Sequence, residues 1–116
     1  MKRILFLCAL LCTTMLYAKQ PQRPNSYNYQ RGVEALVEGE VATGIDYLNK
    51  ELEKKKKNGY AHGWIAAARA SQSEYGAALT AVNKAMQYIP KKDAEYTSWA
   101  YSMRANIYLE LEDTVA

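Results

Sequence analysis

The sequence predicts an all-α fold built from antiparallel helix hairpins, and three observations lead to this fold class. No stretch alternates apolar and polar residues between turn signals, which disfavours β-strands. Apolar residues recur instead with helical spacing, as at Ile45, Leu48 and Leu52. Shifting the chain against itself superposes Ile45 on Leu79 and Leu48 on Val82 in one register. This shift, called the repeat interval below, is ~34 residues. A unit of two helices that repeats at this interval fits into the chain about two and a half times, so we expect five helices.

The first residues have the pattern of a secretory signal peptide. Lys2 and Arg3 precede an apolar run over residues 4–12, and small Ala18 follows at a suitable cleavage point. The run is shorter than the ~20 residues that span a bilayer. We therefore expect residues 1–18 to be cleaved on export, with a retained N-terminal anchor as the alternative.

Cleavage would change the properties of the chain. The mature part, residues 19–116, would lose both cysteines, Cys8 and Cys12, and so would carry no disulfide or thiolate metal site. Its thirteen basic side chains would face twelve acidic ones, a net charge of +1 that does not favour nucleic acid as a partner. We expect a periplasmic or secreted protein of a bacterial cell envelope, with no stable membrane insertion after cleavage.

Turn signals divide the mature chain into helices. Gly39 separates the first two helices, because glycine tolerates the positive φ common at a helix C-terminus. Gly59 is expected to close the second helix, and Ser73 to be the N-cap of the fourth. Pro90 stops the fourth helix, and Asp93 is expected to cap the fifth.

Small residues also superpose at the repeat interval, Gly32 on Ala66 and Gly44 on Ala78. Larger side chains would push apart two helices that cross closely. With the period and Pro90 at the end of the second unit, these positions resemble the tetratricopeptide repeat family. The resemblance implies an α-solenoid, and an unrelated five-helix bundle is the alternative. The resemblance implies a flexible lead-in over 19–25, a repeat domain over 26–113 and a C-terminal end over 114–116. Within the repeat domain the units span 26–57 and 58–91, and a partial third unit spans 97–113.

The resemblance also implies a function and a site. In this family the first helices of the repeats line a concave groove that takes up peptides or extended segments. We therefore expect a non-enzymatic scaffold that binds a protein or peptide, although each groove position could equally serve packing between repeats. Because the third unit lacks its second helix, the alternative is an N-terminal sensory or docking fragment of a longer envelope regulator or enzyme. The implied groove residues are Tyr29, Val33, Leu36, Tyr60, Gly63, Ala67, Ala70, Trp99, Ser102, Asn106 and Leu109.

The mature sequence offers no set of residues for catalysis. Its single histidine, His62, has no cysteine or second histidine near it, so we expect a structural role and neither a metal nor a cofactor. The lysine run at 54–57 is interpreted as a solvated helix C-terminus, where cations are stabilised by the helix dipole. A contact with an anionic surface is its alternative interpretation.

Overall fold

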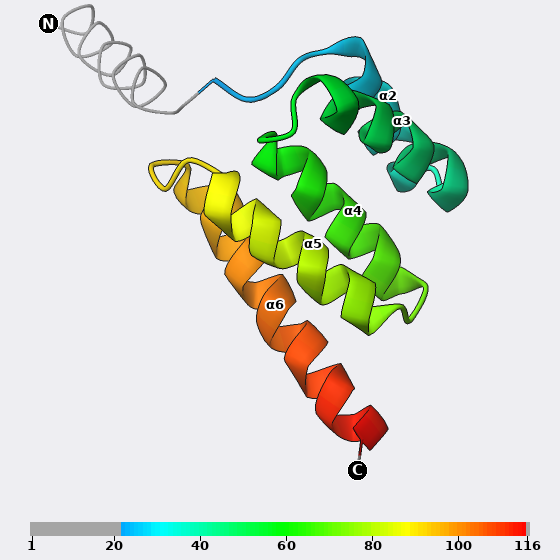
Figure 1. The fold of residues 1–116 in the computed structure, drawn as a ribbon, viewed down its shortest axis with the longest axis vertical. Helices are drawn as coiled ribbons and strands as arrows, with labels where there is room; N and C mark the ends of the chain where they lie inside the picture. The colour runs from blue at the N-terminus through cyan, green and yellow to red at the C-terminus, as the bar shows by residue number, and fades with distance from the viewer. Residues whose placement is uncertain (1–21, 116) are drawn as a thin grey trace, which may run out of the picture.

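The computed structural model describes residues 22–115, and within that range every regular element is an α-helix. Over residues 22–115 the predicted all-α class and the predicted five helices are confirmed. The predicted signal peptide lies outside the described residues. The five helices are α2 (Tyr27–Val37), α3 (Val41–Lys54), α4 (Gly59–Ser71), α5 (Tyr75–Tyr88) and α6 (Ala94–Val115) (Figure 1).

Helices α2 and α3 form a hairpin whose close crossing depends on glycine. Gly39 in the turn has a φ of 87°, as its predicted role requires. At the crossing, a Cβ atom on Gly32 would lie 2.7 Å from Leu48 Cγ, and one on Gly44 would lie 3.0 Å from the Gly32 carbonyl oxygen. The predicted requirement for small residues at these two positions is therefore confirmed.

Helices α4 and α5 form a second hairpin with the same kind of turn. Both ends of α5 follow the corresponding ends of α3 by the repeat interval. Ser73 has a φ of 62° and takes the place of Gly39, while the Glu74 amide donates to the Arg69 carbonyl at 2.9 Å. The prediction that Ser73 is the N-cap of this helix was wrong, because Ser73 belongs to the left-handed turn and Glu74 is the N-cap.

The loop between the hairpins also differs from expectation. Helix α3 ends at Lys54, and Gly59 is the first residue of α4 rather than the end of the helix before it. Asn58 is the N-cap of α4, and its side-chain oxygen accepts from the Ala61 amide. Asn58 also donates to Glu51, whose side chain is buried.

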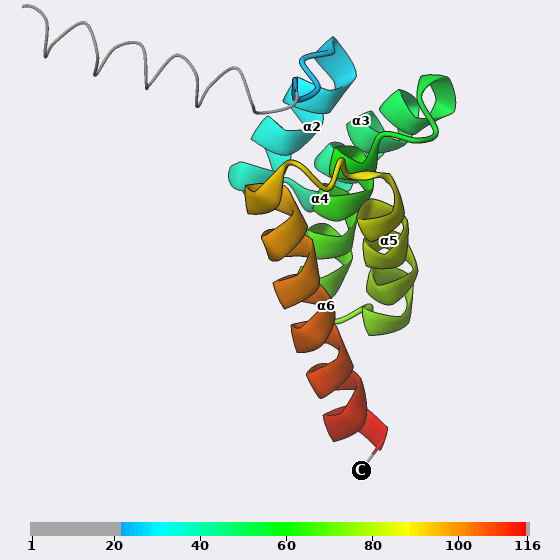
Figure 2. The same ribbon diagram turned by 90° about the vertical axis from the view of Figure 1, so that its left-hand side faces the viewer.

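Helix α6 packs against both α5 and α4, and Figure 2 shows it alongside the second hairpin. Asp93 caps the helix as predicted, since its Oδ1 accepts from the Tyr96 amide at 3.3 Å. The helix begins at Ala94, earlier than the predicted start of the partial unit at residue 97. Beyond its packed face, the side chains of Tyr101, Tyr108 and Leu109 are exposed.

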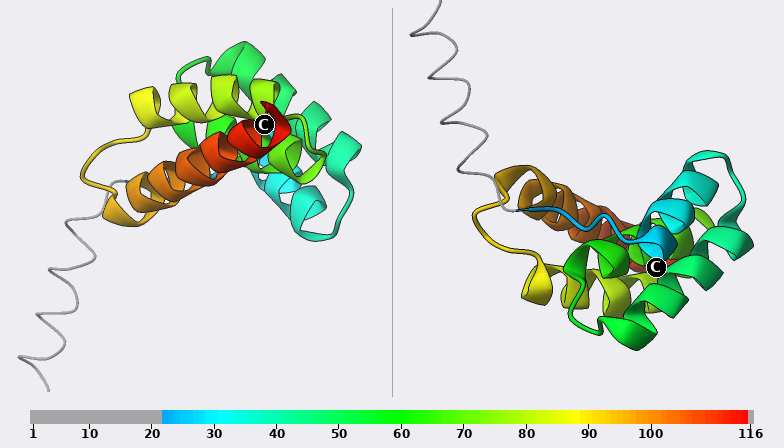
Figure 3. Two further views of the ribbon diagram at one scale, coloured as in Figure 1. Left: turned by 90° about the horizontal axis from the view of Figure 1, so that it is seen from below. Right: turned by 90° about the horizontal axis from the view of Figure 1, so that it is seen from above.

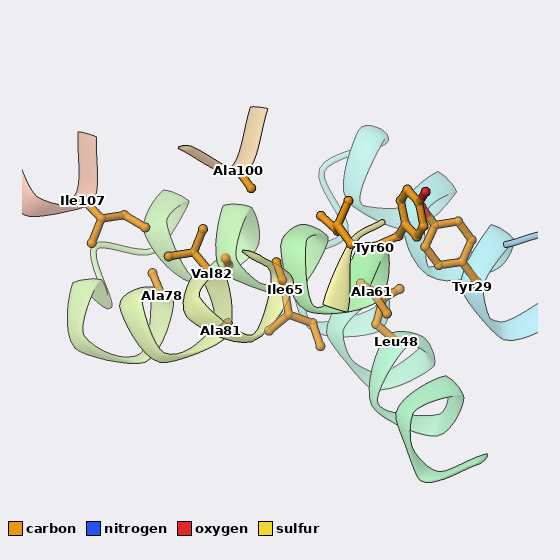
Figure 4. Close-up of a cluster of buried hydrophobic side chains, with 13 residues drawn as sticks. Tyr29, Leu48, Tyr60, Ala61, Ile65, Ala78, Ala81, Val82, Ala100 and Ile107 are labelled. Carbon is orange, nitrogen blue, oxygen red and sulfur yellow. The ribbon is translucent and has the colours of Figure 1, made fainter. Parts of the chain in front are cut away.

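The core is a strip that follows the helices from one hairpin to the next (Figure 4). Its largest fully buried side chains are Leu48, Val82 and Ile107, which come from α3, α5 and α6. Buried alanines such as Ala61 and Ala78 separate them and let the helices approach closely. These side chains form one continuous cluster that extends from Tyr29 of α2 to Ile107 of α6.

Candidate functional site

Five aromatic rings meet where α2, α4 and α6 come together. The Trp64 indole Nε1 donates to the Tyr29 hydroxyl at 3.1 Å, which joins α4 to α2. Trp99 lies with its ring centroid 5.2 Å from that of Trp64 and 5.3 Å from that of Tyr96. Tyr96 in turn packs edge-on against Tyr60 at 4.9 Å. Edge-to-face contacts of this kind are favourable beyond the area they bury, so the cluster fixes the three helices relative to one another.

Two hollows lie along the seam between α4 and α6, and together they are called the α4–α6 groove below. The aromatic hollow has a volume of about 210 Å³ and is lined by Trp64, Glu95, Tyr96 and Trp99. The second, the alanine hollow, has a volume of about 390 Å³ and is lined by Ala67, Ala70, Ser71, Tyr75, Met103, Asn106, Ile107 and Glu110. Because Ala67 follows Trp64 by less than one helical turn, the hollows succeed each other along α4.

Small side chains on α4 shape this groove. A Cβ atom on Gly63 would lie 2.8 Å from Trp99 Cζ3, so glycine lets the indole lie directly against α4. Gly63 is therefore covered by Trp99. Ala67 and Ala70 continue the small surface along the helix and leave the alanine hollow open.

Four of the expected groove residues line the two hollows. Trp99 lies in the aromatic hollow, where its side chain is half-buried. Ala67, Ala70 and Asn106 lie in the alanine hollow. The resemblance thus selects residues from two helices that the fold brings to one seam.

The other expected groove residues lie elsewhere. Tyr29 and Tyr60 are only 7% and 5% exposed, so they belong to the core and present no free ring to a ligand. Leu36 packs over Gly44 inside the first hairpin, and Val33 packs against the core. Leu109 is 59% exposed and is not among the residues that line either hollow. Ser102 is likewise exposed on α6 and outside both linings.

Sequence reasoning missed three residues of the aromatic hollow, namely Trp64, Glu95 and Tyr96. Helical spacing could have found two of them. Trp64 stands three residues before Ala67 and therefore shares its face of α4, and Tyr96 stands three residues before Trp99 on α6. Glu95 carries no such signal, because it reaches the hollow from the first turn of α6.

Asp93 is a buried carboxylate that shares its partner Arg23 with Glu95 of the aromatic hollow. Its oxygens accept from Arg23 Nε and Nη2 at 3.0 and 3.1 Å and from the Tyr60 hydroxyl at 2.8 Å. The Arg23 hydrogen bonds hold the pKa of Asp93 below its ordinary value, against the effect of burial. Burial raises the pKa of Tyr60, so its hydroxyl keeps the proton that it donates to Asp93.

Arg23 anchors the segment that precedes α2. Its guanidinium lies 4.6 Å over the Tyr96 ring and donates to Glu95 Oε2 at 2.9 Å as well as to Asp93. The segment passes the N-terminal end of α6 on its way to α2 (Figure 3). The lead-in over 19–25 was predicted to be flexible. Its described part, residues 22–25, is irregular but bound through Arg23.

His62 has the structural role that its isolation in the sequence predicted. The ring is buried, and its Nε2–H donates to the Lys56 carbonyl at 3.0 Å, which holds the α3–α4 loop. Burial lowers the pKa of His62 below its ordinary value and so favours the neutral ring. Residues 22–115 contain no group of three His, Cys, Asp or Glu side chains placed to hold a metal ion.

The lysine run lines a third and larger hollow, of about 640 Å³, at the α3–α4 loop. All four lysines at 54–57 are exposed. Of the expected groove residues, only the buried Tyr60 is among those that line this hollow. The α4–α6 groove therefore remains the stronger candidate for the site that the sequence indicated.

Comparison with known proteins gives no relative from which a function could be transferred. No protein-family model, curated protein or solved structure matches the chain. Among the described residues, no helix combines the length and the apolar character needed to cross a membrane.

Proposed function

We propose that this chain is a non-enzymatic scaffold that takes up an extended segment of a partner protein in the α4–α6 groove. After cleavage of residues 1–18 it would act in the periplasm or outside the cell. Its architecture would be a tetratricopeptide-like array of two helix hairpins followed by a further first helix.

The spacing of the two hairpins supports this architecture over an unrelated five-helix bundle. Helices α3 and α5 have the same length and are separated by the repeat interval, and the turns before them share a left-handed residue at Gly39 and Ser73. In each turn, the following glutamate amide donates five residues back, to Ala35 or to Arg69. In an unrelated bundle, the two hairpins would not be expected to share both the turn conformation and the length of the helix that follows it.

The observation that carries the proposed binding function is the pair of hollows along one seam. Half-exposed Trp64 and Trp99 offer rigid apolar surface at one end. At the other end, the side chains of Ala67 and Ala70 are single methyl groups that leave space above α4, so a peptide backbone could approach this helix closely. An extended segment fits such a sequence of small hollows better than a compact ligand does.

A substitution that fills the groove tests this function. Peptides selected from a random library on the immobilised protein are expected to bind the Ala67→Arg variant at least about tenfold more weakly, because the longer side chain occupies the alanine hollow. Arginine retains helix propensity, so the circular dichroism spectrum should not change.

The matched control is Ala77→Arg, which makes the same change at an exposed position of α5. This variant should bind the selected peptides as the unaltered protein does. Failure to enrich any peptide, or equal affinity of the Ala67→Arg variant and the unaltered protein, would contradict the proposal.

An exposed apolar face on α6 supports a second candidate function, that of the docking part of a longer envelope protein. Tyr101, Ala105 and Tyr108 succeed one another at helical spacing and are exposed, together with Leu109. In an array of hairpins, a following helix would cover this face. An in-frame amphipathic helix after Ala116 would support this candidate, and a stop codon would contradict it.

A further inference from the structure

The side chains that line the α4–α6 groove carry no positive charge. Each hollow has one carboxylate in its lining, Glu95 in the aromatic hollow and Glu110 in the alanine hollow. None of the residues that line the two hollows is basic, although the chain has fifteen lysines and arginines. The lysine run lines a different hollow. The lining of the aromatic hollow is therefore complementary to a cationic ligand rather than to an acidic one.

One cation of the chain itself already lies at the wall of the aromatic hollow. The Arg23 guanidinium lies 4.6 Å from the centroid of the Tyr96 ring and 2.9 Å from Glu95 Oε2. Tyr96 and Glu95 both line the hollow. An aromatic face beside a carboxylate attracts a cation through the ring quadrupole and through direct pairing. These two residues thus hold a cation in the structure.

The aromatic hollow places two further rings, Trp64 and Trp99, beside the same carboxylate. Trp64, Tyr96 and Trp99 form three of its sides, and the Tyr96 and Trp99 rings stand at 89° to each other. Glu95 is 75% exposed and forms the rim. A volume of about 210 Å³ equals the share of about seven water molecules in the liquid, which is room for a guanidinium or ammonium head and its last methylene groups.

We propose that the aromatic hollow binds an arginine or lysine side chain of the peptide that the groove takes up. This inference rests on the proposed function and adds the chemistry of the ligand. A glutamate or aspartate at the same place would meet a net negative charge, because the single cation Arg23 is shared between Asp93 and Glu95. A neutral side chain would gain the apolar contacts with the rings but neither the cation–π attraction nor the attraction of the carboxylate.

Tryptophan fluorescence can test the inference directly, because the only two tryptophans of the chain, Trp64 and Trp99, both line the hollow. The protein is titrated with blocked alanine–glycine nonapeptides that carry one central Arg, Lys, Gln or Glu. We expect the Arg and Lys peptides to bind about fivefold more tightly than the Gln peptide, and the Glu peptide to bind most weakly. The difference should shrink as salt is added.

A free ammonium compound carries the same kind of cationic group as the peptide side chain and could occupy the aromatic hollow in its place. Tetramethylammonium is titrated in parallel to distinguish the two sources. If it binds as tightly as the Arg peptide, the hollow is a site for a free ammonium compound and the assignment to a peptide side chain is overturned. Weaker binding of tetramethylammonium supports the assignment, because the peptide backbone then contributes in the groove.

The decisive variant is Glu95→Gln, which leaves the rings in place. Its preference for the Arg peptide over the Gln peptide should fall to what the rings alone provide, whereas the matched control Glu112→Gln, at an exposed position of the same helix, should keep the preference in full. An unchanged preference in Glu95→Gln would overturn the inference. Equal affinity of the unaltered protein for the Arg and Gln peptides would overturn this inference but not the proposed function. If none of the peptides binds, both are contradicted.

Discussion

Replacing Asp93 with alanine is expected to lower the free energy of unfolding by about 3 kcal/mol, as measured by urea denaturation followed by circular dichroism. The change removes the N-cap of α6 and leaves the Tyr60 hydroxyl buried without its acceptor. It also releases Arg23, and with it the segment that precedes α2. One residue thus connects α4, α6 and this segment.

The same carboxylate gives the stability a defined dependence on pH. Because the pKa of Asp93 is lowered in the folded protein, the unfolded state binds the proton more readily. The contribution is complete above the ordinary pKa of 3.8 and is lost as the pH falls through the lower folded value. Between pH 5 and pH 3 the unaltered protein should therefore lose more stability than Asp93→Asn does.

The matched control for Asp93 is Glu95→Ala. Glu95 also accepts from Arg23, but it is 75% exposed, so its removal should cost less than about 1 kcal/mol. Equal effects at the two positions would show that the burial of Asp93 does not matter. A loss of less than about 1 kcal/mol on Asp93→Ala would contradict its role as the connection between these segments.

Replacing Gly59 with alanine is the second change with a large expected effect, a loss of about 2 kcal/mol. A Cβ atom there would overlap the Ile89 nitrogen and lie 2.7 Å from the Tyr88 carbonyl carbon. These are backbone atoms at the end of α5, so relief requires movement of the hairpin rather than rotation of a side chain. Thermal and urea unfolding measure the loss.

Gly76 provides a control with the opposite sign. It lies in the first turn of α5, and a Cβ atom there would have no heavy atom within 4 Å. Gly76→Ala should raise the free energy of unfolding by up to about 1 kcal/mol, because alanine loses less backbone entropy in a helix. Destabilisation by both changes to the same extent would contradict the close packing of α4 on the end of α5.

Much of the fold could be predicted because its signals are local. Apolar spacing indicated the helices, and the repeat interval placed Gly32 and Gly44 at the crossing of a hairpin. The same interval also superposes Ser73 on Gly39, which would have identified the left-handed turn. Serine is a common N-cap and rarely adopts a positive φ, so its residue type favoured the wrong assignment.

The site was harder to predict because it depends on how helices from different units meet. Tyr29 and Tyr60 occupy the expected helices, but the aromatic contacts and the bond to Asp93 bury them. The Arg23–Asp93 pair joins residues 70 apart in the sequence, beyond the reach of any repeat spacing. Glu51 stands three residues before the lysine run at 54–57 in the sequence, yet it is buried against the α3–α4 loop.

A chemical-shift map of a selected peptide bound to the isotope-labelled protein tests the proposed binding site most directly. We expect the indole signal of Trp99 and the methyl signals of Ala67 and Ala70 to shift as the peptide is added, while the methyl signal of the exposed Ala77 does not. Shifts confined to the lysines at 54–57 or to the exposed face of α6 would contradict binding in the α4–α6 groove.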